Sequence, residues 1–201
     1  MSNIGYNNYY KVLNAKDFGI PQNRERVFTI SIRKDIDKGF EFPKPIELKL
    51  RLKDLLETKV DEKFYLKDEI VDRFVLKDST LTSTDYKQPK QILQIGTLDI
   101  KGNDQIRRVY ETNGISPSLT TMAGGNTQPK ILESKNLKLS NNFKIRKLTP
   151  RECWRLMGFS DKDFEKAAKV CSNSQLYKQA GNSIVVNVLV NIFNNLEYLF
   201  R

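Results

Sequence analysis

The stretch QLYKQAGNSIVVNVL, residues 175–189, joins an amphipathic segment to a long apolar one. A Gly-Asn-Ser step of this kind normally ends one helix and starts the next. One helix is therefore predicted to begin at Ser172 or Ser174 and to run through Gln179. A second is predicted over about residues 183–198. A helix break does not explain the glutamine two residues before the glycine, so a ligand at this step has to be considered.

The predicted last helix carries one broad apolar face, which should pack on a sheet. The residues of that face are Ile184, Val185, Val188, Leu189, Ile192, Phe193 and Leu196.

The beginning of the chain indicates two strands separated by a loop. Residues 9–13 and 27–32 are strand-like, the second through alternating apolar residues, and residues 14–25 contain Gly and Pro. Residues 35–45, with two prolines, are predicted to be a linker, and residues 48–57 a short helix. Residues 92–131 consist of short β-like runs separated by Gly-Asn and Asn-Gly turns, and residues 132–144 are predicted to be a polar loop.

The segment RKLTPRECWRLMGFS, residues 146–160, contains a helix start. Thr149 is the expected N-cap, Pro150 suits the first helical position, and Glu152 completes a capping box. The helix should cover residues 150–157, with Gly158 following its end. Trp154 is expected in the core.

The composition points to an anionic partner and excludes several kinds of site. The 201 residues include 34 Lys+Arg and 24 Asp+Glu, a formal net charge of +10, which favours nucleic acid through counterion release. Because the charges are interspersed, a lysine-rich protein from an AT-rich genome is the alternative. The absence of histidine excludes Ser-His and Cys-His triads, and two distant cysteines give neither a zinc site nor a disulfide framework. We expect no metal, no signal peptide, no membrane span and a bacterial cytoplasmic location.

Three segments together resemble the last three shared motifs of the DNA cytosine-5 methyltransferases. They are PQNRERVF (21–28), RKLTPRECWRLMGF (146–159) and QLYKQAGNSIVVNVL (175–189), and they occur in the order found in that family. The first two leave room between them for the family's target-recognition region. The resemblance implies an α/β fold: an incomplete, C-terminal portion of a Rossmann-like methyltransferase domain with a small β-rich recognition domain. The implied parts are residues 1–44 (catalytic strands), 45–144 (target recognition) and 145–201 (return to the catalytic domain).

In that family the first segment forms part of the pocket for the flipped cytosine. The resemblance implies that Arg24 and Arg26, with Gln22, hold the target cytosine and the adjacent phosphate. On an extended segment these alternate side chains would project the same way, and the arginine fork suits both phosphate and base. A solvated, salt-bridged turn is the alternative.

By resemblance, the Gly-Asn-Ser step completes the S-adenosylmethionine pocket. We expect Gly181 to let a ligand approach the backbone, and Asn182 and Ser183 to stand at a helix N-terminus that favours a carboxylate. Gln179 would face the same ligand. An ordinary N-cap at Ser183 is the alternative.

The segment DQIRRVYETNGISPSLTTMAGGN, residues 104–126, resembles the recognition loops of small bacterial members, including those that act on GCGC. Gln105 and Arg108 match the two residues that act at the base pairs. A β-hairpin with basic surface residues is the alternative. The full set of expected DNA-recognition residues is Gln105, Arg107, Arg108, Ser118, Thr120, Gly124 and Gly125.

The family's catalytic half is absent from these 201 residues. They contain no Phe-x-Gly-x-Gly loop, no Pro-Cys nucleophile and no Glu-Asn-Val acid, and neither Cys153 nor Cys171 matches the nucleophile. The chain is therefore expected to be the C-terminal portion or subunit of a cytosine-5 methyltransferase of a restriction-modification system. It would be inactive alone and would bind double-stranded DNA and an N-terminal half. The alternatives are a stand-alone DNA-binding or regulatory protein, and a basic RNA-binding protein, which leaves the Gly-Asn-Ser segment unexplained.

Overall fold

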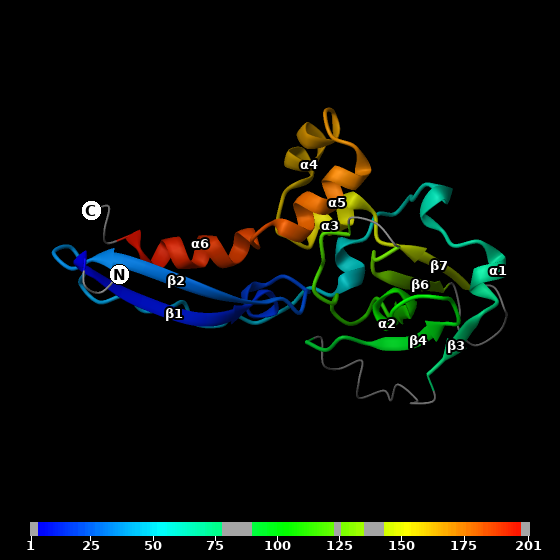
Figure 1. Cartoon of the computed structure of the whole chain (residues 1–201), viewed down its shortest axis with the longest axis horizontal. Coiled ribbons are helices and arrows are strands. Elements are labelled where there is room, and N and C mark those ends of the chain that lie inside the picture. Colours follow the sequence, from blue (N-terminus) through cyan, green and yellow to red (C-terminus); the bar gives the residue numbers. More distant parts are fainter. Residues whose placement is uncertain (1–3, 78–89, 123–125, 135–142, 198–201) are drawn as a thin grey trace.

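In the computed structural model, two strands and the last helix form an arm that projects from a larger body (Figure 1). The structure describes residues 4–77, 90–122, 126–134 and 143–197. The arrangement confirms the expected α/β class. Within these ranges, no helix combines the length and the apolar character needed to cross a bilayer.

The arm is built from strands β1 (Tyr6–Asn14) and β2 (Glu25–Arg33) and helix α6 (Val186–Asn195). The strands pair antiparallel along their whole length, from Tyr6 opposite Arg33 to Asn14 opposite Glu25. A 3-10 turn, η2 (Ala15–Phe18), follows β1 and ends at Gly19 with a φ of 82°.

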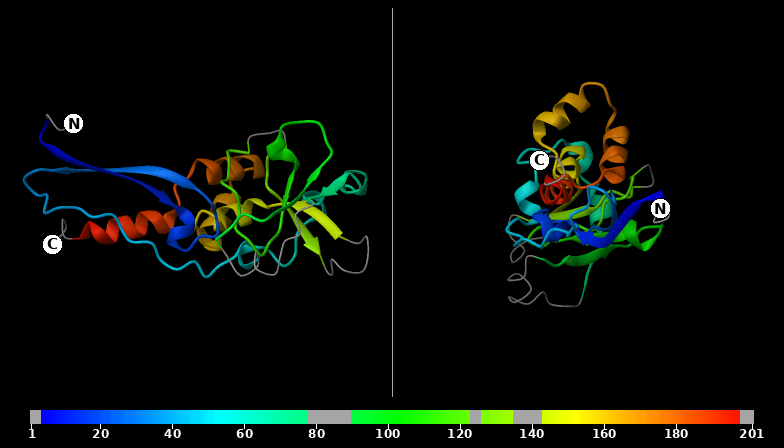
Figure 2. Two further views of the ribbon diagram at one scale, coloured as in Figure 1. Left: turned by 90° about the horizontal axis from the view of Figure 1, so that it is seen from below. Right: turned by 90° about the vertical axis from the view of Figure 1, so that its left-hand side faces the viewer.

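Helix α6 runs alongside the two strands and closes one face of them (Figure 2). Val185, Val188, Ile192 and Leu196 are buried at helical spacing, and they belong to the same core as Leu13 and Ile32 of the strands.

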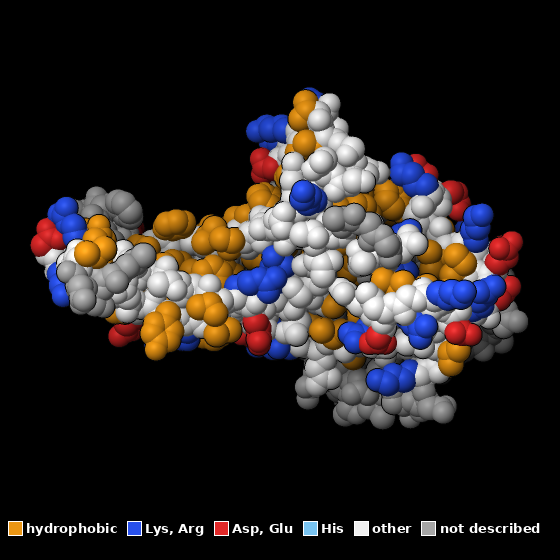
Figure 3. Space-filling view, in the orientation of Figure 1, with side chains coloured by type: hydrophobic (Ala, Val, Ile, Leu, Met, Phe, Trp, Pro, Cys, Tyr) orange, Lys and Arg blue, Asp and Glu red, His pale blue; other side chains and the backbone are white. Residues whose placement is uncertain are grey.

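The opposite face of the β1–β2 sheet is uncovered. Tyr10, Val12 and Val27 are 79%, 57% and 67% exposed, and Val12 lies directly opposite Val27. Hydrophobic side chains are visible over the arm in the space-filling view (Figure 3). Tyr10, Val12 and Val27 are together called the arm face below.

The body contains a five-stranded sheet in the order β3-β4-β5-β6-β7. Neighbouring strands are antiparallel except for the parallel pair β5–β6. A separate small core lies against this sheet and includes Ile95, Val109 and Ile145. The strands are β3 (Phe74–Leu76), β4 (Gln94–Leu98), β5 (Arg108–Tyr110), β6 (Lys130–Ser134) and β7 (Phe143–Lys147). Short helical turns surround it: η3 (Leu52–Leu55), η4 (Glu62–Phe64), α1 (Asp68–Val71) and α2 (Asp104–Arg107).

Three helices connect the body to the arm: α3 (Pro150–Arg155), α4 (Asp161–Ala168) and α5 (Asn173–Asn182). The predicted capping box is confirmed, because Thr149 Oγ1 accepts from the Glu152 amide and Glu152 Oε2 accepts from the Thr149 amide. Gly158 has a φ of 82°, as expected after the helix end. Trp154 is buried and donates from Nε1 to the Leu176 carbonyl at 3.0 Å.

Several predicted elements differ from the structure. Residues 48–57 form only the turn η3, because a single side chain of that turn, Leu52, is buried. Residues 132–144 are not all loop, since β6 continues to Ser134 and β7 begins at Phe143. Helix α4 was not predicted. The expected division at residue 144 falls inside β7.

The helix break at the Gly-Asn-Ser step also lies elsewhere. Helix α5 extends through Asn182, Ser183 is its C-cap, and α6 begins only at Val186. Asn182 and Ser183 therefore stand at a helix C-terminus, and the prediction of a helix N-terminus at these residues was wrong.

Candidate functional site

The loop after η2, the segment after β5 and the end of α5 meet at one place. Gln22 is fully buried there: its Nε2 donates to the Leu156 carbonyl at 2.8 Å and its Oε1 accepts from the Leu119 amide at 3.1 Å. The backbones of the two loops also run side by side, with an isolated bridge between Gln22 and Ser116. We call residues 116–122 the recognition loop.

Arg24 ties the recognition loop to the end of α5. Its Nη1 donates to the Leu119 carbonyl at 2.8 Å, and its Nη2 donates to the carbonyls of Gly181 and Ser183 at 2.8 and 3.0 Å. The side chain is buried, and burial, with the nearby charge of Arg26, lowers the pKa of Arg24 to about 10. Its hydrogen-bond acceptors are neutral oxygens. Arg24 is therefore a buried cation held by backbone dipoles.

Arg26 is exposed, unlike Gln22 and Arg24. Its Nη1 donates to the Glu25 carbonyl at 2.6 Å. Arg24 and Arg26 both line a cavity of about 10 Å³ beside Phe28 and Ile184, which is roughly the space of one water. Of the three predicted pocket residues, only Arg26 has a side chain free to reach an external ligand. Gln22 and Arg24 are occupied by main-chain groups, so neither is the solvated turn residue of the alternative.

The four predicted cofactor residues lie together at the end of α5. Gln179 and Asn182 are exposed, Ser183 is half-buried, and Gly181 is buried. A helix C-terminus favours positive charge, so the carboxylate expected here has no support from a helix dipole. Exposed amide and hydroxyl groups still give this corner the donors and acceptors of a polar ligand wall.

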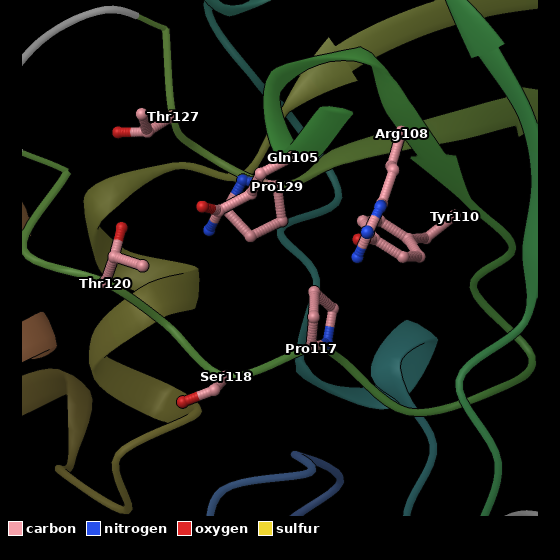
Figure 4. Close-up of a pocket in the computed structure, with 8 residues that line it drawn as sticks. All are labelled: Gln105, Arg108, Tyr110, Pro117, Ser118, Thr120, Thr127 and Pro129. Carbon is pink, nitrogen blue, oxygen red and sulfur yellow. The ribbon is translucent and has the colours of Figure 1, made fainter. Parts of the chain in front are cut away.

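A second hollow opens between α2 and the recognition loop (Figure 4). It has a volume of about 310 Å³. Arg108 and Gln105 approach it from one side and Ser118 from the other. The structure thus brings together four of the residues expected to read DNA. The lining is Gln105, Arg108, Tyr110, Pro117, Ser118, Thr120, Thr127 and Pro129.

Arg108 is held by its own helix turn. Its Nε donates to Asp104 Oδ2 at 2.8 Å and its Nη2 donates to the same oxygen. The hydrogen bond that Arg108 donates to Asp104 raises the pKa of Arg108, so its positive charge is retained. The Arg108 guanidinium lies at the hollow shown in Figure 4, with Tyr110 beside it.

Other predicted recognition residues are placed differently. Arg107 does not line this hollow, and its Nε donates to the Ile100 carbonyl at 2.7 Å. Gly124 and Gly125 lie outside the described residues.

Cys153 is unsuited to nucleophilic attack in this structure. Cys153 is fully buried, and burial, followed by the charge of Glu152, raises its pKa well above the ordinary value. Thiolate is the reactive form, so Cys153 is inert. Cys171 is half-buried and contacts Gln179 Nε2 at 3.5 Å.

Two buried basic residues were not singled out from the sequence. Arg146 is fully buried and pairs with Glu152 at 2.8 Å and with Glu133, which connects β6 and β7 to α3. Lys130 is also buried, and its Nζ donates to the carbonyls of Asn126 and Gln128. Burial and the charge of Lys147 lower the pKa of Lys130 to about 8. Neither residue has a sequence signal, because a lysine or arginine in a strand is normally exposed.

Known proteins share both the sequence and the fold. The orphan methyltransferase M.SPBetaI of Bacillus phage SPbeta is 38% identical over 271 residues, covering 100% of this chain and 60% of the relative. The type II methyltransferase M.HhaI of Haemophilus parahaemolyticus is 40% identical over 202 residues, covering 98% and 55%. The chain thus spans less than two thirds of these relatives. The Dnmt2 methyltransferase structure of S. pombe has a TM-score of 0.64 at 20% identity, covering 97% of this chain and 57% of that one.

The sequence model of the C-5 cytosine-specific DNA methylases matches residues 1–198, nearly the whole chain. With these relatives, and with its three shared motifs joined at one site by Gln22 and Arg24, this chain belongs to the C-5 cytosine-specific DNA methylase family.

Proposed function

We propose that this chain is the C-terminal portion or subunit of a DNA (cytosine-5)-methyltransferase of a restriction-modification system. It acts in the bacterial cytoplasm on a flipped cytosine within a specific duplex site. The observation that carries the proposal is the meeting of Arg24, the recognition loop and the end of α5. That junction brings residues suited to DNA reading next to residues suited to cofactor binding.

In this proposal the hollow beside α2 faces the major groove. Arg108 and Gln105 read base edges, while Ser118 and Thr120 contact the duplex from the recognition loop. The net charge of +10 adds attraction to phosphates that is independent of sequence. Extruding the cytosine costs a few kcal/mol, which the duplex contacts must offset.

Arg26 is the residue of the first motif that contacts the flipped cytosine or its phosphate. Its exposed guanidinium lies where strand β2 meets the start of α6, at the cavity shared with Ile184. Gln22 and Arg24 hold the wall of that pocket through the recognition loop.

S-adenosylmethionine supplies an electrophilic methyl group when bound. Gln179, Asn182 and Ser183 form one wall of its site, with Gly181 in the backbone behind them. These groups fit the cofactor because they are polar, accessible, and lie at a helix C-terminus, which favours the positive charges of its sulfonium and amine.

The remaining chemistry requires a partner. A thiolate must add to cytosine C6 before C5 can accept the methyl group, and loss of the C5 proton must then expel the thiolate from C6. Cys153 is buried and protonated and cannot serve. The uncovered arm face fits a second polypeptide that packs against the two-stranded sheet, because an isolated hairpin is marginal in water. We therefore propose an N-terminal half as the partner.

The test uses labelled S-adenosylmethionine and duplex DNA. The 201-residue chain is assayed alone and joined to the part of the SPbeta relative that this chain does not span. Transfer is expected only from the joined protein. Transfer by the chain alone would contradict the proposal. Sequence-specific binding without transfer by the joined protein would favour the stand-alone DNA-binding alternative.

The cofactor wall is tested separately in the joined protein. Asn182→Ala should raise the concentration of S-adenosylmethionine needed for half-maximal transfer and leave duplex affinity unchanged, because the side chain is exposed at the end of α5. Equal weakening of both ligands would indicate a folding defect and count against the assignment.

A further inference from the structure

Position 181 requires a glycine because the recognition loop packs directly against it. The residue lies in the last turn of α5 and has no left-handed φ, so conformational freedom does not explain the glycine. A Cβ atom at this position would lie 2.0 Å from the Thr120 carbonyl oxygen and 2.6 Å from the Thr121 Cα. Both atoms belong to the backbone, which cannot rotate away. The expectation that the glycine admits a ligand is therefore replaced by a contact within the protein.

Arg24 fastens the same two segments from the other side. One of its terminal nitrogens donates to the loop at Leu119, and the other donates to α5 at Gly181 and to Ser183 beyond it. The acceptors are separated from Arg24 by 95, 157 and 159 positions in the sequence. Lysine could keep the charge, but its single nitrogen lacks the planar fork that spans both segments.

The recognition loop forms one wall of the hollow beside α2. Ser118 and Thr120 belong to the loop, whereas Gln105 and Arg108 come from α2 and the start of β5. The distance from the loop residues to Gln105 and Arg108 therefore depends on the contacts that hold the recognition loop in place. Phosphate attraction depends on the basic surface instead and is insensitive to a small shift of one loop.

We propose that Gly181 and Arg24 are positioning residues for DNA specificity: they hold the recognition loop at the register that base reading requires, without touching DNA. The role in base reading rests on the proposed function, whereas the joint between loop and helix does not.

The first arm of the test measures amide hydrogen exchange in the full chain without DNA. The variants are Gly181→Ala and Arg24→Lys, with Ser174→Ala and Arg33→Lys as controls at exposed sites of α5 and β2. Both variants should speed exchange of the Leu119 and Ser116 amides about tenfold, the equivalent of one charge-assisted hydrogen bond. Amides in the β6–β7 pairing should keep wild-type rates. Unchanged exchange rates in residues 116–122 in both variants would show that Gly181 and Arg24 do not hold the recognition loop.

The second arm measures binding at fixed salt to a duplex selected by the wild-type chain from a randomised pool, and to its single-base variants. Both variants should lose about tenfold in discrimination and keep their affinity for unrelated duplex. Equal loss on every duplex would overturn the specificity role. If the wild-type chain selects no sequence, DNA reading under the proposed function is contradicted, and the specificity role is contradicted with it. The hydrogen-exchange measurement still tests whether Gly181 and Arg24 hold the recognition loop against α5.

Discussion

At the scale of single residues, the structure separates three side chains that the sequence presents as equivalent. Gln22 and Arg24 are buried against main-chain groups, and Arg26 is exposed. The spacing of every second residue along an extended segment predicts only that the three side chains point the same way. It does not predict which groups of the folded protein each side chain contacts. Arg26 is the one of the three suited to contact an external ligand.

Arg108 gives the sharpest test of base reading. If its fork binds a guanine edge, Arg108→Ala should cost about 1–3 kcal/mol of discrimination at one base pair and leave the other positions unchanged. The measurement is binding to duplexes that differ by single base pairs at fixed salt. Gln105→Ala should affect a different base pair, since the two side chains approach the hollow separately (Figure 4). A uniform loss on all duplexes, with a smaller salt slope, would make Arg108 a phosphate contact.

Lys130 predicts an unusual dependence of stability on pH. Its folded pKa of about 8 lies below the ordinary 10.5, so the unfolded chain binds more protons between these values. The free energy of unfolding should therefore rise with pH, by about 1–2 kcal/mol between pH 8 and about pH 9.5. Below pH 8 the burial penalty is fully present.

Urea unfolding at several pH values measures this rise. Lys130→Met should flatten it, whereas Lys101→Met, at an exposed turn position, should keep it. An equal rise in wild type and Lys130→Met would assign it to other groups, with Lys147 the nearest.

At the scale of elements, a buried ion pair joins the five-stranded sheet to α3. Arg146 on β7 and Glu152 on α3 are both fully buried, and Glu152 also caps its own helix. Burial opposes the charge of Arg146, but hydrogen bonds from its guanidinium to Glu152 and Glu133 outweigh it and raise its pKa. The capping box seen in the sequence is thus also the attachment point of the recognition sheet.

Removing the charge of Glu152 should lower the stability of the folded chain. Glu152→Gln leaves the buried Arg146 with Glu133 as its charged partner, so the free energy of unfolding should fall by about 3 kcal/mol. Urea unfolding at neutral pH provides the measurement. Asp35→Asn breaks the exposed pair with Arg33 and should leave stability unchanged. A loss for Glu152→Gln no larger than that of this control would show that the pair contributes nothing to the joint.

At the scale of the whole molecule, the arm leaves an apolar surface in water. Tyr10, Val12 and Val27 are exposed on β1 and β2, Phe193 is exposed on α6, and Ile184 is exposed just before α6. Apolar surface of this kind favours association when no partner covers it. The buried positions of α6 are Val188 and Ile192, so Ile184 and Phe193 of the predicted apolar face remain outside.

The 201-residue chain produced alone should self-associate through the arm face. Replacing Val12 and Val27 together by lysine should shift it towards monomer, because two adjacent charges would then oppose burial. Sedimentation over a range of concentrations measures the shift. Val170→Lys, which is 85% exposed at the turn between α4 and α5, serves as the matched control and should leave association unchanged. A wild-type chain that stays monomeric at high concentration would contradict this.

The sequence by itself determined the elements whose signals are local. The strands of the arm and the capped start of α3 follow from alternation and capping residues within a few positions of each other, whereas the α/β class came from the family resemblance. Helix α4 was missed although Ser160 and Asp163 supply a capping pair, and its mostly polar surface gave no apolar period.

Only the tertiary structure decided what the polar residues of the site do. The side chains of Gln22 and Arg24, and the site of a Cβ at Gly181, meet segments 61 to 159 positions away, as in the approach of Thr120 to Gly181 and of Ser183 to Arg24. Local sequence does not encode such distant partners. A glycine in a helix end, an arginine among carbonyls and a lysine buried at pKa about 8 therefore acquire their roles only when the chain closes around them.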